Sequence, residues 1–135
     1  MQKILIALCL ICFQNPVFAA DDETVVVEKI PGYVSLGDAM VLNLSNDSRR
    51  LTYLQLKADV LVKDDRAREI VEKHIPAIRH QLILLLSEQS ALDMKTPSKR
   101  ELVRQQATQQ IRDIIEQVSG NKDIEEVLFS SFLVQ

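Results

Sequence analysis

Apolar and polar residues alternate most clearly between Leu51 and Val62. From Leu54 onward every second residue is apolar, whereas the positions between are mostly polar. The apolar set is Leu54, Leu56, Ala58, Val60 and Val62, and the other set is Tyr53, Gln55, Lys57 and Asp59. A period of two over this length is typical of a strand with one buried and one wet face. The pattern therefore predicts an antiparallel sheet.

Further segments have the composition of strands. Thr24–Ile30 is rich in β-branched residues and ends at a Pro-Gly turn signal, and Tyr33–Leu36 and Met40–Leu44 flank Gly37-Asp38. Four turn-favouring residues, 45–48, then predict a hairpin loop. The chain closes with the apolar segment Val127–Gln135. We expect this terminus to be docked in the sheet, because an apolar strand left loose would be an exposed edge.

After the long strand the period of the apolar residues changes to three or four. The repeating positions are Ala67, Val71, Ile75, Ile78, Leu82 and Leu85. They predict an amphipathic helix, or two nearly collinear helices, bent at Pro76. Asp64-Asp65 would cap its start. The run Leu82–Leu86 is apolar on nearly every side, so we expect it to be central to the core.

A second helix is predicted after a connection over residues 87–95. Thr96 would be its N-cap, Pro97 would occupy its first position, and Gly120-Asn121 would end it in a left-handed C-cap. Its apolar stripe would be Val103, Ala107, Ile111, Ile114 and Val118. The predicted order is β-β-β-α-α-β. This order is typical of an α+β fold, an antiparallel sheet with two to three helices packed on one face.

The N-terminal segment has the three parts of a secretory signal peptide. Met1 and Lys3 supply positive charge, Ile4–Phe13 is apolar, and Val17-Phe18-Ala19 resembles a cleavage site after Ala19. The apolar run would span about 15 Å as a helix, half of a membrane core of about 30 Å. We therefore predict a signal peptide over 1–19, with an uncleaved short anchor as the alternative. An acidic lead-in and first strand (20–29) and one domain (30–135) would follow.

Composition narrows the chemistry. Export leaves about 116 residues, enough for one domain. Both cysteines, Cys9 and Cys12, lie in the apolar run, so the mature chain would have neither a disulfide nor a thiol nucleophile. The net charge of −3 and the absence of Trp argue against a nucleic-acid partner.

No catalytic or metal-binding pattern emerges. His74 and His80 are six residues apart, whereas a zinc pair on a helix needs four. Ser130-Ser131 lack the glycines of a nucleophile elbow, and Asp64-Asp65 suit capping better than acid–base chemistry. Lys99-Arg100 and Arg104 form a small basic cluster, for which a solvated face is favoured over a site for an anionic partner. We predict no enzyme, no cofactor and no metal.

Three stretches in this order and spacing resemble the C-terminal periplasmic domain of the FliL family, the flagellar basal body-associated proteins. The first comprises Tyr33–Leu36, Val41–Leu44 and Tyr53-Leu54, the second Ile75–Arg79, Leu82–Leu86 and Thr96-Pro97, and the third Val127–Gln135. The resemblance covers roughly residues 30–135. The residues that carry the family motif, in a structural role, would be Tyr33, Asn43, Pro76, Arg79, Pro97, Phe129, Phe132 and Gln135.

The resemblance implies a non-enzymatic protein that supports flagellar rotation beside the stator. It also implies homo-oligomeric rings, a fold similar to stomatin-type domains, and a periplasmic location at the inner membrane near the basal body. This chain departs from typical members by having only Lys3 and an interrupted apolar run in place of a full transmembrane helix. The alternative is a periplasmic module that binds a lipid or another small apolar ligand, suggested by the surplus of Leu and Ile around Leu82–Leu86.

Overall fold

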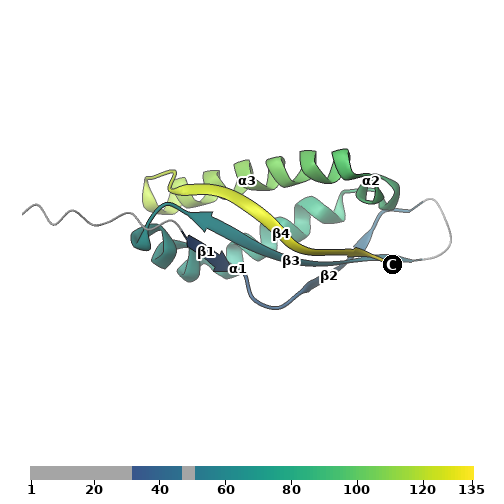
Figure 1. The fold of residues 1–135 in the computed structure, drawn as a ribbon, viewed down its shortest axis with the longest axis horizontal. Helices are drawn as coiled ribbons and strands as arrows, with labels where there is room; N and C mark the ends of the chain where they lie inside the picture. Colours follow the sequence, from purple (N-terminus) through teal and green to yellow (C-terminus); the bar gives the residue numbers. More distant parts are fainter. Residues whose placement is uncertain (1–31, 47–50) are drawn as a thin grey trace, which may run out of the picture.

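The computed structural model describes residues 32–46 and 51–135, which form four strands and three helices (Figure 1). Their bounds are β1 Gly32–Ser35, β2 Met40–Leu44, β3 Thr52–Val62, α1 Asp65–Ser87, α2 Ala91–Lys95, α3 Pro97–Ser119 and β4 Ile124–Val134. The predicted signal peptide with its cleavage site at Ala19, the strand Thr24–Ile30 and part of the hairpin loop lie outside the described residues.

The long strand β3 is the centre of the sheet. On one side β1 pairs with residues 59–62 of β3 and β2 with residues 52–56, so the two short strands share one edge. On the other side β4 runs along residues 54–62 of β3. All three of these strand pairings are antiparallel. The predicted α+β class and antiparallel sheet are confirmed.

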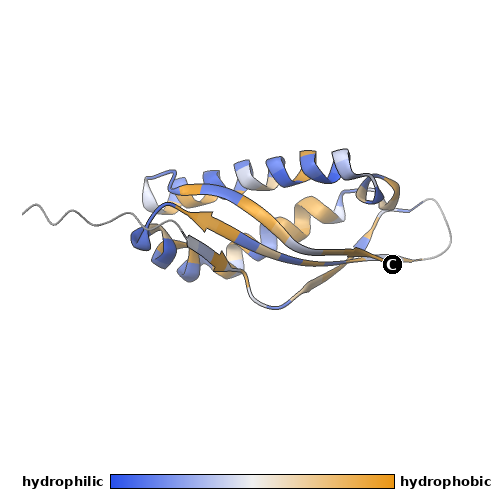
Figure 2. Cartoon of the chain, in the orientation of Figure 1, coloured by the Kyte–Doolittle hydropathy of each residue, from blue (hydrophilic) through white to orange (hydrophobic). Residues whose placement is uncertain are grey.

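Helices α1 and α3 cover one face of this sheet (Figure 1). The predicted two-sided character of β3 is confirmed, because all five residues of its apolar set are almost completely buried while Tyr53, Gln55 and Lys57 are exposed. Figure 2 shows the same division by hydropathy: apolar residues dominate the strands, whereas the visible turns of α3 are mostly hydrophilic. A single core therefore lies between the sheet and the two long helices.

Helix α1 is continuous from Asp65 to Ser87 and contains Pro76 in its interior. The Asp64 side chain caps its start by accepting a hydrogen bond from the backbone N–H of Ala67 at 2.8 Å, as predicted. The central burial predicted for the whole run 82–86 is wrong for two residues, since Ile83 and Leu84 are 36% and 47% exposed. Five consecutive residues cover all sides of a helix, but only one side of α1 meets the core.

The stripe predicted for α3 is confirmed in its first half and wrong at its end. Val103, Ala107 and Ile111 are buried, but the next buried residue is Ile115, while Ile114 is only partly buried and Val118 is half exposed. A step of three residues turns a helix by about 60° to one side, and a step of four by about 40° to the other. Periodicity alone could not choose between Ile114 and Ile115.

The start of α3 and the segment before it differ in part from the predictions. Pro97 opens α3 as expected, but Thr96 occupies the N-cap position without a capping hydrogen bond from its side chain. The segment predicted to be a connection contains the short helix α2, whose start is capped by Ser90 Oγ accepting from the N–H of Asp93 at 3.0 Å. The spacing of Ser90 and Asp93 was the available signal, since it resembles a capping box.

Strand β4 begins at Ile124, three residues earlier than predicted, and bulges interrupt its register near Glu125 and Ser130. Phe132 and Val134 lie opposite Leu56 and Leu54 and pack against the core. The final residue, Gln135, exchanges two backbone hydrogen bonds with Tyr53, at 2.8 and 2.9 Å. The docking of the C-terminus in the sheet is confirmed.

Helix α3 ends at Gly120, which adopts a left-handed conformation with φ of 75°. No described atom lies within 4 Å of where a Cβ would stand, so an added methyl group meets no obstacle. We therefore expect Gly120→Ala to lower the free energy of unfolding by about 1 kcal/mol through backbone strain alone. Gly120→Asn should cost less, because Asn tolerates this region. Urea unfolding of both variants measures the difference, and equal losses would contradict the explanation.

Candidate interaction surface

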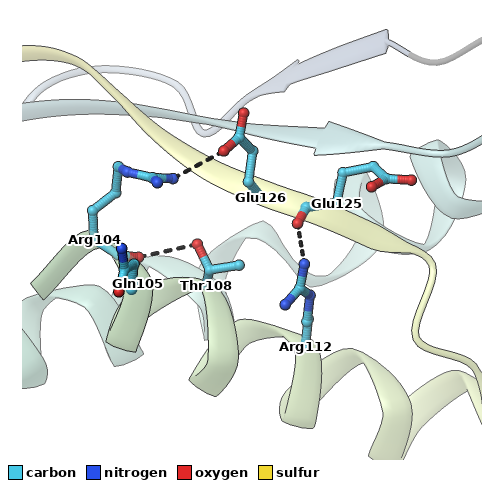
Figure 3. Close-up of a pocket in the computed structure, with 6 residues that line it drawn as sticks. All are labelled: Arg104, Gln105, Thr108, Arg112, Glu125 and Glu126. Atoms are coloured by element: carbon cyan, nitrogen blue, oxygen red, sulfur yellow. Dashed lines mark hydrogen bonds and ion pairs between the residues drawn. The ribbon is translucent and has the colours of Figure 1, made fainter. Parts of the chain in front are cut away.

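Three side chains of α3 connect this helix to the first half of β4. Arg104, Thr108 and Arg112 are spaced by four residues and so lie on one side of the helix (Figure 3). Arg104 Nη1 donates to the carbonyl of Val127 at 2.9 Å, and Thr108 Oγ1 accepts from the N–H of Val127 at 3.0 Å. Arg112 donates to the carbonyls of Ile124, at 3.0 Å, and Glu125. We call this set the α3–β4 seam.

Arg104 also holds two carboxylates. Its Nε and Nη2 form a bidentate pair with Glu101 at 2.8 and 2.7 Å, and its Nη1 lies 3.1 Å from Glu126 (Figure 3). The hydrogen bond from Arg104, followed by that from Gln105, lowers the pKa of Glu101 from 4.5 to about 2. The same bond with Glu101 is the main cause that raises the pKa of Arg104. Four of the five N–H donors of the Arg104 guanidinium are thereby bonded.

This pairing predicts a pH dependence. Because the pKa of Glu101 is lower in the folded protein, its stabilising contribution is complete above about pH 4.5 and disappears as the pH falls towards 2. We expect Glu101→Gln to have a lower melting temperature than the wild type at pH 7, with the gap closing between pH 4.5 and 2. Thermal unfolding across this range measures it. A gap that stayed constant with pH would contradict the assignment to Glu101 ionisation.

Two hollows lie along the seam. One, of about 210 Å³, is lined by Arg104, Gln105, Thr108, Arg112, Glu125 and Glu126 (Figure 3). The other, of about 200 Å³, is lined by Pro97, Arg100, Glu101, Arg104, Phe129 and Phe132, and we call it the aromatic hollow. In the first hollow the Thr108 hydroxyl is bonded to backbone groups of Arg104 and Val127, and the Glu126 carboxylate is held by Arg104.

The aromatic hollow unites three of the predicted motif residues, Pro97, Phe129 and Phe132. The rings of Phe129 and Phe132 have centroids 5.6 Å apart, and the guanidinium carbon of Arg100 lies 5.4 Å from the centre of the Phe132 ring. This distance is within the range of a cation–π interaction. The predicted basic cluster is divided: Arg104 is neutralised in the seam, Arg100 lies over an aromatic ring, and Lys99 is exposed.

Arg79 binds a different part of the fold. From the middle of α1 its Nη1 donates to the carbonyls of Leu36, at 2.8 Å, and Asp38, at 2.7 Å. These carbonyls belong to the turn between β1 and β2, which passes through Gly37 in a left-handed conformation with φ of 91°. Arg79 therefore fixes the point at which the edge of the sheet changes from one short strand to the next.

The remaining motif residues lie apart from one another. Tyr33 and Asn43 are exposed on the face of the sheet that α1 and α3 do not cover, which we call the open face (Figure 1). Pro76 is exposed on α1, and the backbone of Gln135 is hydrogen-bonded to that of Tyr53.

Four apolar or aromatic residues are exposed on the open face: Tyr33 (59%), Val41 (65%), Tyr53 (40%) and Leu133 (49%). The open face is therefore a second candidate for contact with another protein.

The histidines and serines considered as candidates from the sequence are not brought together in one site. His74 Nδ1 lies 2.8 Å from the carbonyl of Ile70, His80 is exposed, and Ser130 and Ser131 face solvent on β4. Sequence reasoning missed Thr108 and Arg112. Thr108 is a polar residue on the buried stripe of α3, and its spacing of four from each arginine was the signal that could have found the seam.

Comparison with known families gives one match. The model of the flagellar basal body-associated protein FliL matches residues 33–135, which include β1 from its second residue and every later described strand and helix. No curated protein matches the chain. Among the described residues, the helices are too short or too polar to cross a membrane.

Proposed function

Because the chain belongs to the FliL family of flagellar basal body-associated proteins, we propose that it supports flagellar rotation without catalysing a reaction. In this proposal it binds the stator and further copies of itself. The observation that carries it is the family match, which extends from β1 to the last residue of the chain. The exposed apolar residues of the open sheet face and the two hollows along the seam supply surfaces for such contacts.

The proposed location is the periplasm, at the inner membrane beside the basal body. It rests on the N-terminal segment, whose charge, apolar run and Val17-Phe18-Ala19 sequence are those of an export signal. We expect cleavage after Ala19, which gives a mature protein that begins at Ala20. The intact mass of protein recovered from cells measures the cut, and a mass that retains residues 1–19 would support the anchor instead.

Motility tests the role. Deletion of the gene should lower swimming speed in a viscous medium, where the motor carries a high load, and a plasmid copy should restore it. Complementation with Val41→Lys should restore less motility than complementation with Asn43→Lys. Both residues lie exposed on β2 and gain the same charge, but only Val41 is apolar. Unchanged motility of the deletion strain under load would contradict the proposed function.

The lipid-binding alternative has less support. Leu82, Leu85 and Leu86 are buried in the core, and the hollow beside Leu85, of about 440 Å³, is otherwise lined by Glu88 and four glutamines. An apolar ligand would meet few apolar atoms there. Native mass spectrometry of the purified protein separates the two: a co-purifying ligand would favour the alternative, and oligomers that increase with concentration would favour self-association.

A further inference from the structure

The outer edge of β4 has two halves that differ in their hydrogen bonding. In an antiparallel pair, residues that exchange backbone hydrogen bonds alternate with residues whose N–H and C=O groups point away from the partner strand. Gln135 exchanges both bonds with Tyr53, so Val134 and Phe132, opposite Leu54 and Leu56, direct their backbone groups outward. The bulge near Ser130 shifts this alternation by one residue, and Val127 also points outward, since its N–H and C=O both bond side chains of α3.

The near half of this edge is closed by the protein itself. The outward groups of Val127 and the carbonyls of Ile124 and Glu125 are all bonded by the α3–β4 seam. Among the described residues, the outward N–H and C=O groups of Phe132 and Val134 have no such partner. In Figure 1 the end of β4 diverges from the start of α3, and the aromatic hollow lies between them. The distal half of the edge is therefore available for pairing.

The charge beside this open half is basic. Arg100 lies over the Phe132 ring and forms no ion pair with a described residue, whereas Lys99 lines a different hollow together with Asp93. The nearby Glu101 carboxylate is already bound in a bidentate pair by Arg104. A carboxylate brought into the aromatic hollow would therefore meet the guanidinium of Arg100 without a competing acid. A cation over an aromatic ring can bind a carboxylate while the ring contacts apolar side chains next to that carboxylate.

We propose that the distal half of β4, from Phe129 to Val134, binds an extended acidic segment of a partner protein as an added strand. The backbone of the segment pairs with the outward groups of Phe132 and Val134, and one of its carboxylates binds Arg100 in the aromatic hollow. Strand addition of this kind takes its affinity from backbone hydrogen bonds and its specificity from alternate side chains. An exposed strand edge is otherwise a liability for aggregation.

A second copy of this chain is the less suitable occupant. The distal half of β4 contains no acidic residue, and neither does β1 or β2 at the opposite edge. Pairing two β4 edges would bring two Arg100 side chains into one interface without a carboxylate, and pairing β4 with β2 would also offer Arg100 no carboxylate. The charges therefore favour a different protein over self-association through this edge.

The test uses the full-length protein and a fluorescent peptide of about eight residues, with alternating valine and threonine and one central aspartate. Hydrogen exchange detected by NMR should slow at the amides of Phe132 and Val134 when the peptide binds. Arg100→Ala should weaken binding about tenfold, which corresponds to about 1.4 kcal/mol. Lys99→Ala removes the same charge one residue away and should leave the affinity within twofold. A peptide with alternate amides N-methylated should not bind, because it cannot form the ladder.

Several outcomes would overturn the proposal. They are the absence of binding at millimolar peptide, protection of the β2 amides of Val41 and Asn43 instead, or equal losses in Arg100→Ala and Lys99→Ala. Protection of Phe132 and Val134 that rises with protein concentration, without peptide, would assign the edge to a second copy and reject the partner segment. The assay contains no flagellar component, so a negative result would leave the proposed function standing.

Discussion

Deletion of the last four residues, Phe132 to Gln135, is expected to abolish stable folding. The deletion removes two side chains that pack against the core and exposes one side of Leu54 and Leu56, which are completely buried and lie opposite them in the sheet. It also removes the backbone pair between Gln135 and Tyr53. Loss of buried apolar side chains costs about 2–5 kcal/mol each, and a domain has about 5–15 kcal/mol in total. We expect a loss of at least about 4 kcal/mol, measured by circular dichroism during thermal and urea unfolding.

A matched pair of substitutions separates this packing effect from the mere shortening of the strand. Phe132→Ala acts on the core side of β4 and should cost about 2–3 kcal/mol. Leu133→Ala acts on the neighbouring residue, which is half exposed on the open face, and should cost less than about 1 kcal/mol. A truncated protein with an unchanged melting temperature, or equal costs for the two substitutions, would refute the role assigned to the terminal strand.

Replacement of Arg79 by Met is expected to be the most damaging change at a polar side chain. The variant keeps the apolar part of the side chain but loses the two charge-assisted hydrogen bonds to the carbonyls of Leu36 and Asp38. Leu36 is almost completely buried, so its carbonyl would lose a partner that water replaces poorly. We expect a loss of about 2–3 kcal/mol in urea unfolding, accompanied by faster hydrogen exchange in the turn between β1 and β2.

Lys73→Met is the control for Arg79→Met. It lies exposed on the same helix and forms no ion pair with a described residue, so its loss should change the free energy of unfolding by less than about 0.5 kcal/mol. If both variants lost the same stability, the effect would come from removing a positive charge from α1. The anchoring of the turn by Arg79 would then be rejected.

The features of the fold that could be predicted from the sequence are those that depend on a single element. The faces of β3, the cap at Asp64 and the left-handed end at Gly120 were predictable, because each depends on residues within one element. The choice of Ile115 over Ile114 depends on how α3 sits against the sheet, which no local pattern specifies. The partners of Arg79 and Arg112 are backbone carbonyls, and a carbonyl carries no sequence signal. The only sequence signal of the seam was therefore Thr108, a polar residue among the apolar positions of the α3 stripe.

The central position of β3 has a consequence for the order in which the domain folds. Its partners β1 and β2 precede it closely in the chain, but β4 begins 62 residues after β3 ends (Val62 to Ile124), so closing that pair carries a larger entropic cost and slows folding. During synthesis β4 leaves the ribosome after the other described elements, and until then the long edge of β3 lacks its partner strand. The sheet cannot be completed before β4 has emerged. Under the proposed export as an unfolded chain, this delay gives the protein time to engage the export machinery before its native structure closes.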